Sequence, residues 1–91
     1  MTTAELATAL PEIVTEQVPG PKSKELLDRR DAAIPKALCG KTYPICIKQG
    51  SGAMFEDMDG NKFLDWVGGV GVLNIGYSHP EVIEAVKKQT E

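Results

Sequence analysis

Hydrophobic and polar positions are most clearly organised in the middle of the chain. Residues 53–57 and 62–66 both carry apolar side chains, and the turn residues Asp59-Gly60-Asn61 separate them. An Asp-Gly pair between two such runs is typical of a tight β-hairpin. Upstream, residues 45–47 favour a strand, and the Gly-Ser-Gly sequence at 50–52 allows a bend or bulge. The pattern predicts a small antiparallel sheet with a hairpin at Asp59-Gly60.

A helix is predicted on each side of this sheet. The first has Ser23 as its N-cap and ends near Ala33, because Pro35 disfavours further helix. The second begins at Pro80, with Ser78 and Glu81 at the spacing of a capping box. Its apolar stripe consists of Val82, Ile83 and Val86. We therefore predict an α+β fold: a helix, a small antiparallel sheet and a C-terminal helix.

The two ends of the chain differ from this central part. Residues 1–20 have a weak helical pattern that Pro11 interrupts, and the following residues 18–21 (Val-Pro-Gly-Pro) favour extended backbone. We assign residues 1–20 to an N-terminal arm and residues 21–91 to the structured segment. The last helix runs to Glu91 with neither glycine nor proline to end it, which predicts that the sequence is incomplete.

Composition narrows the possible functions. A chain of 91 residues forms at most one small domain, and its net charge of -3 gives no basic surface for nucleic acid. Glu5 and Glu12 interrupt the N-terminal region where a signal peptide needs an apolar core, so we expect a cytoplasmic protein. The spacing of Cys39 and Cys46 fits neither a redox pair nor a zinc site, which predicts two reduced thiols.

A glycine-rich segment, Gly68-Gly69-Val70-Gly71, follows the predicted hairpin. Bare α-carbons let main chain and a few chosen side chains approach a bound small molecule, so we interpret this segment as the wall of a pocket. Neither common phosphate motif fits it. Asn74 stands where the dinucleotide fingerprint needs glycine, and Tyr77 stands where the P-loop needs lysine.

The sequence contains no complete set of catalytic residues. His79 is the single histidine, and a helix N-terminus beside it disfavours a basic role. One histidine and two separated cysteines are too few for a zinc site. The acidic residues Glu56, Asp57 and Asp59 lack the remaining positions of a calcium loop, so we interpret them as a solvated hairpin tip. No residue is predicted to be catalytic or to bind metal.

Two motifs in register carry a family resemblance. Residues 57–65 read Asp-x-Asp-Gly-Asn-x-Phe-Leu-Asp, and residues 74–89 read Asn-x-Gly-Tyr-x-His-Pro-x-Val-x-x-Ala-Val-x-x-Gln. With the upstream segment Pro19 to Arg30, they resemble the N-terminal region of class III aminotransferases, which are pyridoxal-phosphate enzymes of fold type I. Within that family the chain is most similar to 4-aminobutyrate aminotransferases.

The resemblance implies a chain several times longer than this one. The Schiff-base lysine and the aspartate that pairs with the pyridine nitrogen would lie on the large domain, outside residues 1–91. The resemblance therefore implies that residues 1–91 contain no cofactor-binding residue. It implies that the full-length enzyme binds pyridoxal 5'-phosphate and that this segment alone does not. The implied reaction passes the amino group of 4-aminobutyrate to 2-oxoglutarate. The implied enzyme is a cytoplasmic homodimer or dimer of dimers that binds no nucleic acid and no membrane.

The resemblance also gives the glycine segment a role. Val70, with Gly69 and Gly71, would form one wall of the substrate pocket, and Gly68 and Asn74 would hold its shape. An aliphatic residue at position 70 suits a short linear ω-amino acid, whereas ornithine-type members tend to have an aromatic residue there.

Three alternatives remain open at this stage. The first is that Val70 is a plain core valine and not part of a pocket wall. The second is that the amino donor is another ω-amine (ornithine, acetylornithine or lysine). The third is that the chain is a non-catalytic interaction module. We also expect exposed apolar surface around residues 70–75 and along the stripe of Val82 and Val86.

Overall fold

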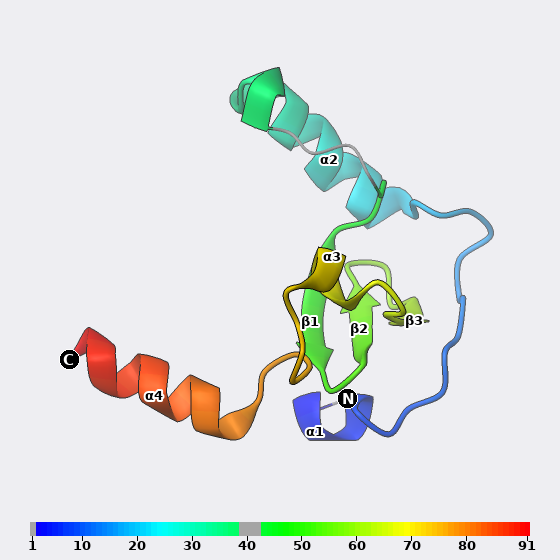
Figure 1. Ribbon diagram of the computed structural model, residues 1–91. Coiled ribbons are helices and arrows are strands. Elements are labelled where there is room, and N and C mark those ends of the chain that lie inside the picture. The colour runs from blue at the N-terminus through cyan, green and yellow to red at the C-terminus, as the bar shows by residue number, and fades with distance from the viewer. Residues whose placement is uncertain (1, 39–42) are drawn as a thin grey trace.

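The structure of the protein is a computed structural model that describes residues 2–38 and 43–91 (Figure 1). Cys39, about which a reduced thiol was predicted, lies outside the described residues. The fold is α+β, as the sequence predicts. Its elements in chain order are α1 (Thr3–Leu6), α2 (Pro21–Ala33), the 3₁₀ helix η1 (Lys36–Leu38), β1 (Ile47–Ser51), β2 (Met54–Asp57), β3 (Lys62–Leu64), α3 (Gly68–Gly71) and α4 (Pro80–Thr90).

The three strands form one antiparallel sheet in the order β1-β2-β3. The predicted hairpin at Asp59-Gly60 is confirmed, because β2 pairs with β3 across this turn and Gly60 has a φ of 90°. The bend expected at residues 50–52 occurs at Gly52, whose φ is 60°. The first strand was predicted too early: β1 begins at Ile47, and its register irregularity falls between Ile47 and Gln49.

Both predicted helix caps were wrong. The N-cap of α2 is Gly20, and Ser23 lies buried inside the helix. The side chain of Asp59, in the hairpin turn, accepts the N–H groups of Lys22 and Ser23 at 2.7 and 2.9 Å, so a distant residue caps this helix.

The cap of α4 is His79, whose Nδ1 accepts the N–H of Glu81 at 3.3 Å. Ser78, which was predicted to form a capping box with Glu81, has a φ of 55° and is not in capping geometry. The expected place of Pro80 in the first turn of α4 is confirmed. Pro35 likewise follows the end of α2 at Ala33, as predicted.

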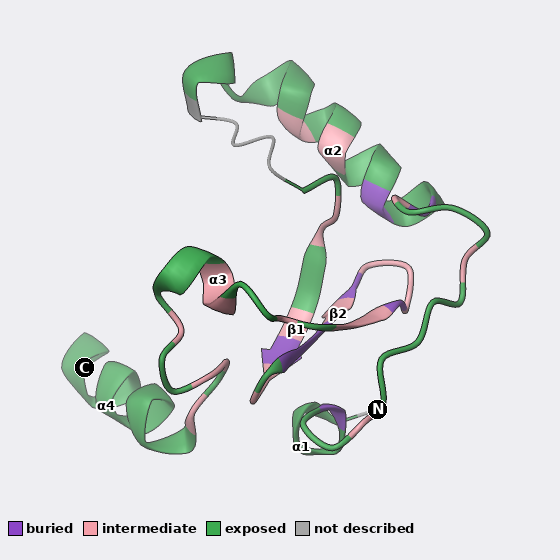
Figure 2. Cartoon of the chain, turned by 45° about the vertical axis from the view of Figure 1, so that its right-hand side comes forward, coloured by how far each residue is buried: buried purple, intermediate pink, exposed green. Residues whose placement is uncertain are grey.

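The apolar core is small and lies between α1 and the sheet (Figure 2). Its buried side chains are those of Leu6, Met54 and Phe55. The ring of Phe55 stacks on Phe63 across the β2–β3 pair, with centroids 5.1 Å apart, and meets Tyr77 edge-on at 6.1 Å. Such aromatic contacts add to the stabilisation that burial alone provides.

A buried polar network joins the N-terminal arm to the hairpin. Asn61 is fully buried, and its Oδ1 accepts the N–H of Val14 at 2.7 Å and that of Thr15 at 3.2 Å. Its Nδ2 donates to Asp57 Oδ2 at 2.9 Å and to Thr15 Oγ1 at 3.0 Å. The interpretation of Asp57 as part of a solvated hairpin tip was wrong, because Asp57 is fully buried and also accepts the N–H groups of Asp59 and Asn61. These bonds fix the arm along β3.

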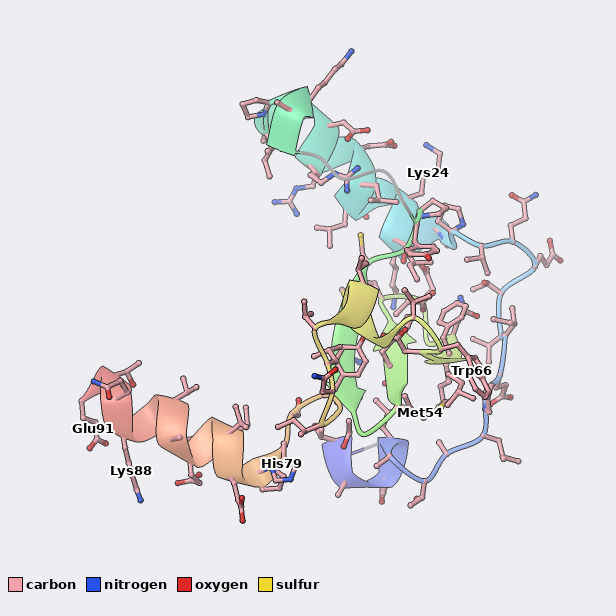
Figure 3. All side chains as sticks on the ribbon, in the orientation of Figure 1. Lys24, Met54, Trp66, His79, Lys88 and Glu91 are labelled. Atoms are coloured by element: carbon pink, nitrogen blue, oxygen red, sulfur yellow. The ribbon has the colours of Figure 1, made fainter. Side chains whose placement is uncertain are left out.

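The C-terminal helix α4 leaves its apolar side chains uncovered. Figure 1 shows α4 projecting away from the sheet, and every residue of this helix is exposed. In Figure 3 His79 lies at the end of α4 near the sheet, and Lys88 and Glu91 lie at the far end. The radius of gyration is 14.4 Å, whereas a compact domain of this length has about 12 Å. The predicted exposure of the Val82/Val86 stripe is confirmed.

Candidate functional site

A largely apolar hollow of about 660 Å³ lies beside the sheet. Its lining comes mainly from the three strands, the segment before β1 and the glycine-rich turn, with Val18 and Arg30 contributed by earlier parts of the chain. Aromatic and aliphatic residues dominate the lining, which includes Ile47, Phe55, Phe63, Trp66, Val67, Gly69, Val70 and Tyr77. Apolar walls with a few placed polar groups are typical of sites for small molecules.

The glycine-rich turn, residues 68–71, has an unusual backbone. Its four φ angles are 63°, 62°, 62° and 82°, so the chain makes a left-handed turn. Three of the four residues are glycines, which adopt this conformation without steric cost. Val70 is the exception, with φ 62° and ψ 44°. A β-branched residue is a true outlier there, and the conformation costs about 1–2 kcal/mol.

The carboxylate of Asp65 holds the start of this turn. Its Oδ1 accepts the N–H of Val67 at 3.0 Å and that of Gly68 at 2.9 Å. Its Oδ2 accepts the N–H of Gly69 at 2.9 Å and the hydroxyl of Tyr77 at 2.5 Å. The Tyr77 hydroxyl, together with these amides, holds the pKa of Asp65 below its ordinary 3.8, although burial opposes the shift.

Tyr77 connects this turn to the sheet. Its backbone pairs with Gly52 through two hydrogen bonds of 2.9 and 3.2 Å. Its ring lies so close to Gly50 that a Cβ atom at that position would be 2.6 Å from Tyr77 Cγ. Burial, followed by the hydrogen bond and charge of Asp65, raises the pKa of Tyr77 to about 12. The phenol is therefore a hydrogen-bond donor at neutral pH and no candidate base.

The structure places two of the three predicted site residues on the hollow. Gly69 and Val70 line it, whereas Gly71 follows them in the turn without lining it. The side chain of Val70 is 73% exposed, so it is no core valine in the described part of the chain. Val72 and Ile75 are 78% and 60% exposed, which confirms the apolar surface expected in this region.

The sequence reasoning missed Asp65 and Tyr77. A signal for Asp65 was available, because it precedes the glycines at the spacing from which an aspartate side chain accepts amides further along the chain. No local signal exists for Tyr77, which reaches Asp65 only because its backbone pairs with Gly52, the residue after β1.

Other chemistry-bearing groups are few. Arg30, near the end of α2, lines the hollow and forms an ion pair with Asp31 at 3.2 Å. Cys46 is a half-buried free thiol whose pKa is raised, chiefly by burial. In residues 2–38 and 43–91 we find no group of three or more histidine, cysteine or acidic residues that could hold a metal ion. None of the helices in these ranges has the length and hydropathy to cross a bilayer.

Comparisons with known proteins place this geometry in context. The chain is 40% identical over 81 residues to an alanine/serine racemase from Pyrococcus horikoshii, which covers 89% of this chain and 17% of that protein. It is 42% identical over 78 residues to a 4-aminobutyrate aminotransferase from Mycobacterium leprae, covering 86% and 17%. The chain thus spans about a sixth of the length of these relatives.

A solved structure agrees with the sequence relatives. The fold matches the crystal structure of an omega-transaminase from Sphaerobacter thermophilus with a TM-score of 0.65 and 29% identity, over 80% of this chain and 18% of that one. The family model described as Aminotransferase class-III matches residues 37–91. This range contains the hairpin, the left-handed turn and α4, and it is more than half of the sequence, so the chain belongs to the class III aminotransferase family.

Proposed function

We propose that residues 21–91 are the N-terminal segment of a pyridoxal-phosphate-dependent aminotransferase that passes the amino group of 4-aminobutyrate to 2-oxoglutarate. In this proposal Val70, Gly69 and Gly71 form one wall of the pocket for the amino donor. The observation that supports it best is the position of Val70, an exposed side chain on the apolar hollow of a class III aminotransferase chain.

The shape of the wall favours a slender donor. Gly69 presents bare main chain beside Val70, and the hollow continues over aliphatic and aromatic side chains such as Leu64 and Phe63. A methylene chain gains free energy by leaving water for such a surface, at about 0.8 kcal/mol per buried CH₂. An unbranched ω-amino acid therefore suits this wall better than a bulky donor.

The cofactor is proposed to be held elsewhere. The family implies dependence on pyridoxal phosphate, whose amine partner is a sheltered lysine of depressed pKa. Of the lysines that the structure describes, none lines the hollow, where Arg30 is the cationic group. The residues of this chain therefore do not fit the role of cofactor anchor. We assign that lysine to polypeptide outside residues 1–91.

The proposal extends to assembly and location. Trp66, Val70 and Val72 are 88%, 73% and 78% exposed, and large exposed apolar residues that lie together mark contact surfaces. This exposure supports a full-length enzyme in which further polypeptide covers these residues. We propose that this enzyme is a cytoplasmic homodimer or dimer of dimers. Its partners would be small amines and 2-oxo acids.

A second candidate keeps the family and changes the donor. The similarity to an omega-transaminase structure supports another ω-amine, such as ornithine, acetylornithine or lysine. The racemase relative shows that a protein of similar sequence has a different named activity. Formation of glutamate from 2-oxoglutarate with each amine in turn separates these reactions, because a racemase would invert alanine and form no glutamate.

The wall is tested in the complete enzyme with Val70→Trp. We expect the larger side chain to raise KM for 4-aminobutyrate about tenfold or more, equivalent to about 1.4 kcal/mol, by narrowing the pocket. Val14→Trp is the matched control, since Val14 is also an exposed valine but does not line the hollow. Equal KM values for the two variants would contradict the proposal, as would complete absence of glutamate formation with every ω-amine.

A further inference from the structure

We propose that Asp65 and Tyr77 are positioning residues that clamp the left-handed turn and thereby fix Val70 against the amino donor. The inference rests on the proposed function of Val70. It adds to that function Asp65 and Tyr77, which also line the hollow and would control donor binding through the position of Val70. The clamp is a continuous chain of contacts from the sheet, through Tyr77 and Asp65, to the amides of the turn.

The left-handed turn needs to be held in place by contacts outside it. Val70 has left-handed backbone angles that valine disfavours, and its side chain is 73% exposed. Little packing by this side chain compensates for the conformation. The backbone bonds of the turn itself, from Gly71 N to Val67 O and from Val72 N to Gly68 O, do not tie it to the sheet.

Asp65 connects the turn to the sheet. A carboxylate offers about four acceptor positions, and all four are used: three by the amides of residues 67–69 and one by the hydroxyl of Tyr77. Hydrogen bonds to a charged acceptor are about twice as strong as neutral ones. Because no acceptor position is left for a ligand, Asp65 holds the turn and is neither a general base nor a contact for the donor's ammonium.

Tyr77 is itself held by contacts with the sheet and with Gly52. It is fixed by two backbone hydrogen bonds to Gly52, by an edge-on contact with Phe55, and by the close approach of its ring to Gly50. The hydrogen bond from its hydroxyl therefore fixes the Asp65 carboxylate relative to the sheet. Removing this one oxygen leaves the ring packing in place and releases the carboxylate on one side.

Tyr77→Phe tests the clamp with least disturbance to the fold. In the 91-residue chain we expect hydrogen exchange at the amides of Gly68 and Gly69 to become about tenfold faster. Carbon-13 detection of the Asp65 carboxyl should show its pKa rising toward 3.8, because the Tyr77 bond is the main cause of the depression. Tyr43→Phe is the matched control for both measurements, since Tyr43 is an exposed tyrosine outside this network.

The positioning role is tested in the complete enzyme. We expect Tyr77→Phe and Asp65→Asn to raise KM for the amino donor about three- to tenfold and to change kcat by less than about twofold. Asp28→Asn, on the exposed face of α2, serves as the control. Unchanged amide exchange in Tyr77→Phe would refute the clamp alone. An unchanged KM in Val70→Trp would instead overturn the proposed function, and the positioning role with it.

Discussion

Asn61→Ala should cost this chain a large part of its stability. The Asn61 side chain is fully buried and links two segments: the N-terminal arm through Val14 and Thr15, and the hairpin through Asp57. Alanine removes all of these bonds. It leaves the Asp57 carboxylate buried without one of its donors, and it frees the arm from β3.

The loss in the free energy of unfolding depends on which polar groups lose a hydrogen-bond partner in Asn61→Ala. A buried polar group left unsatisfied costs about 1–3 kcal/mol, and more when it is charged. Water replaces Asn61 easily at Val14, which is exposed, but less easily at Asp57, which is fully buried. We therefore expect a loss of about 2–4 kcal/mol. A chain of 91 residues has about 5–14 kcal/mol in total, and a core of three buried apolar side chains favours the lower end.

Urea unfolding followed by far-ultraviolet circular dichroism measures this loss. Trp66 is 88% exposed and would be a poor fluorescent reporter. With a slope of about 1–1.5 kcal/mol/M for so small a protein, the midpoint should fall by about 2 M. Gln17→Ala is the matched control, because Gln17 is an exposed amide residue whose side chain makes no hydrogen bond in the described part of the chain; its free energy of unfolding should change by less than about 0.5 kcal/mol. Equal midpoints for the two variants would refute the reasoning.

Three further predictions concern packing against the sheet at Gly50, the acid dependence of stability through Asp59, and backbone strain at Val70. Gly50→Ala should lower the melting temperature, because the new Cβ would lie 2.6 Å from Tyr77 Cγ, and overpacking costs about 1–3 kcal/mol; an unchanged melt would contradict this. The amides of Ser23 and Lys22 hold the pKa of Asp59 below 3.8 against the opposing effect of burial. The ionised Asp59 carboxylate therefore stabilises the fold above pH 3.8, and this stabilisation is lost as the pH falls below that value. The urea midpoint should decline less steeply on acidification in Asp59→Asn than in the unaltered chain. Val70→Asn should raise the melting temperature, since asparagine tolerates left-handed angles, and a lowered melt would argue against strain at this position.

Local sequence signals predicted the elements that local chemistry decides. The Asp-Gly pair located the hairpin, Pro35 limited α2, and Pro80 marked the first turn of α4. The helix caps could not be predicted from local sequence signals. Asp59 caps α2 from 36 and 37 residues away, so no reading of Ser23 and its neighbours could reveal it. A cap supplied across the fold depends on tertiary structure that a single segment does not encode.

The candidate site likewise has features that the sequence predicts and features that depend on the tertiary structure. Glycine content indicated a thin wall around Val70, and Gly69 and Val70 do line the hollow. The left-handed angles of Val70 were not predictable, because valine disfavours them and local propensity indicates the opposite. They become possible only when Asp65 and Tyr77 are brought together by pairing of Gly52 with Tyr77.

The combination of strain and exposure at Val70 argues for function more strongly than either feature alone. A strained residue is ordinarily kept in place by the packing of its own side chain, but Val70 is 73% exposed and gains little from contacts within the described residues. Stability alone would therefore favour asparagine or glycine at this position. Valine is explained if its two methyl groups contact something outside this chain, which under the proposed function is the amino donor or adjoining polypeptide. On this reasoning Val70→Asn should gain stability while it weakens donor binding in the complete enzyme, the opposing changes expected where strain serves a site.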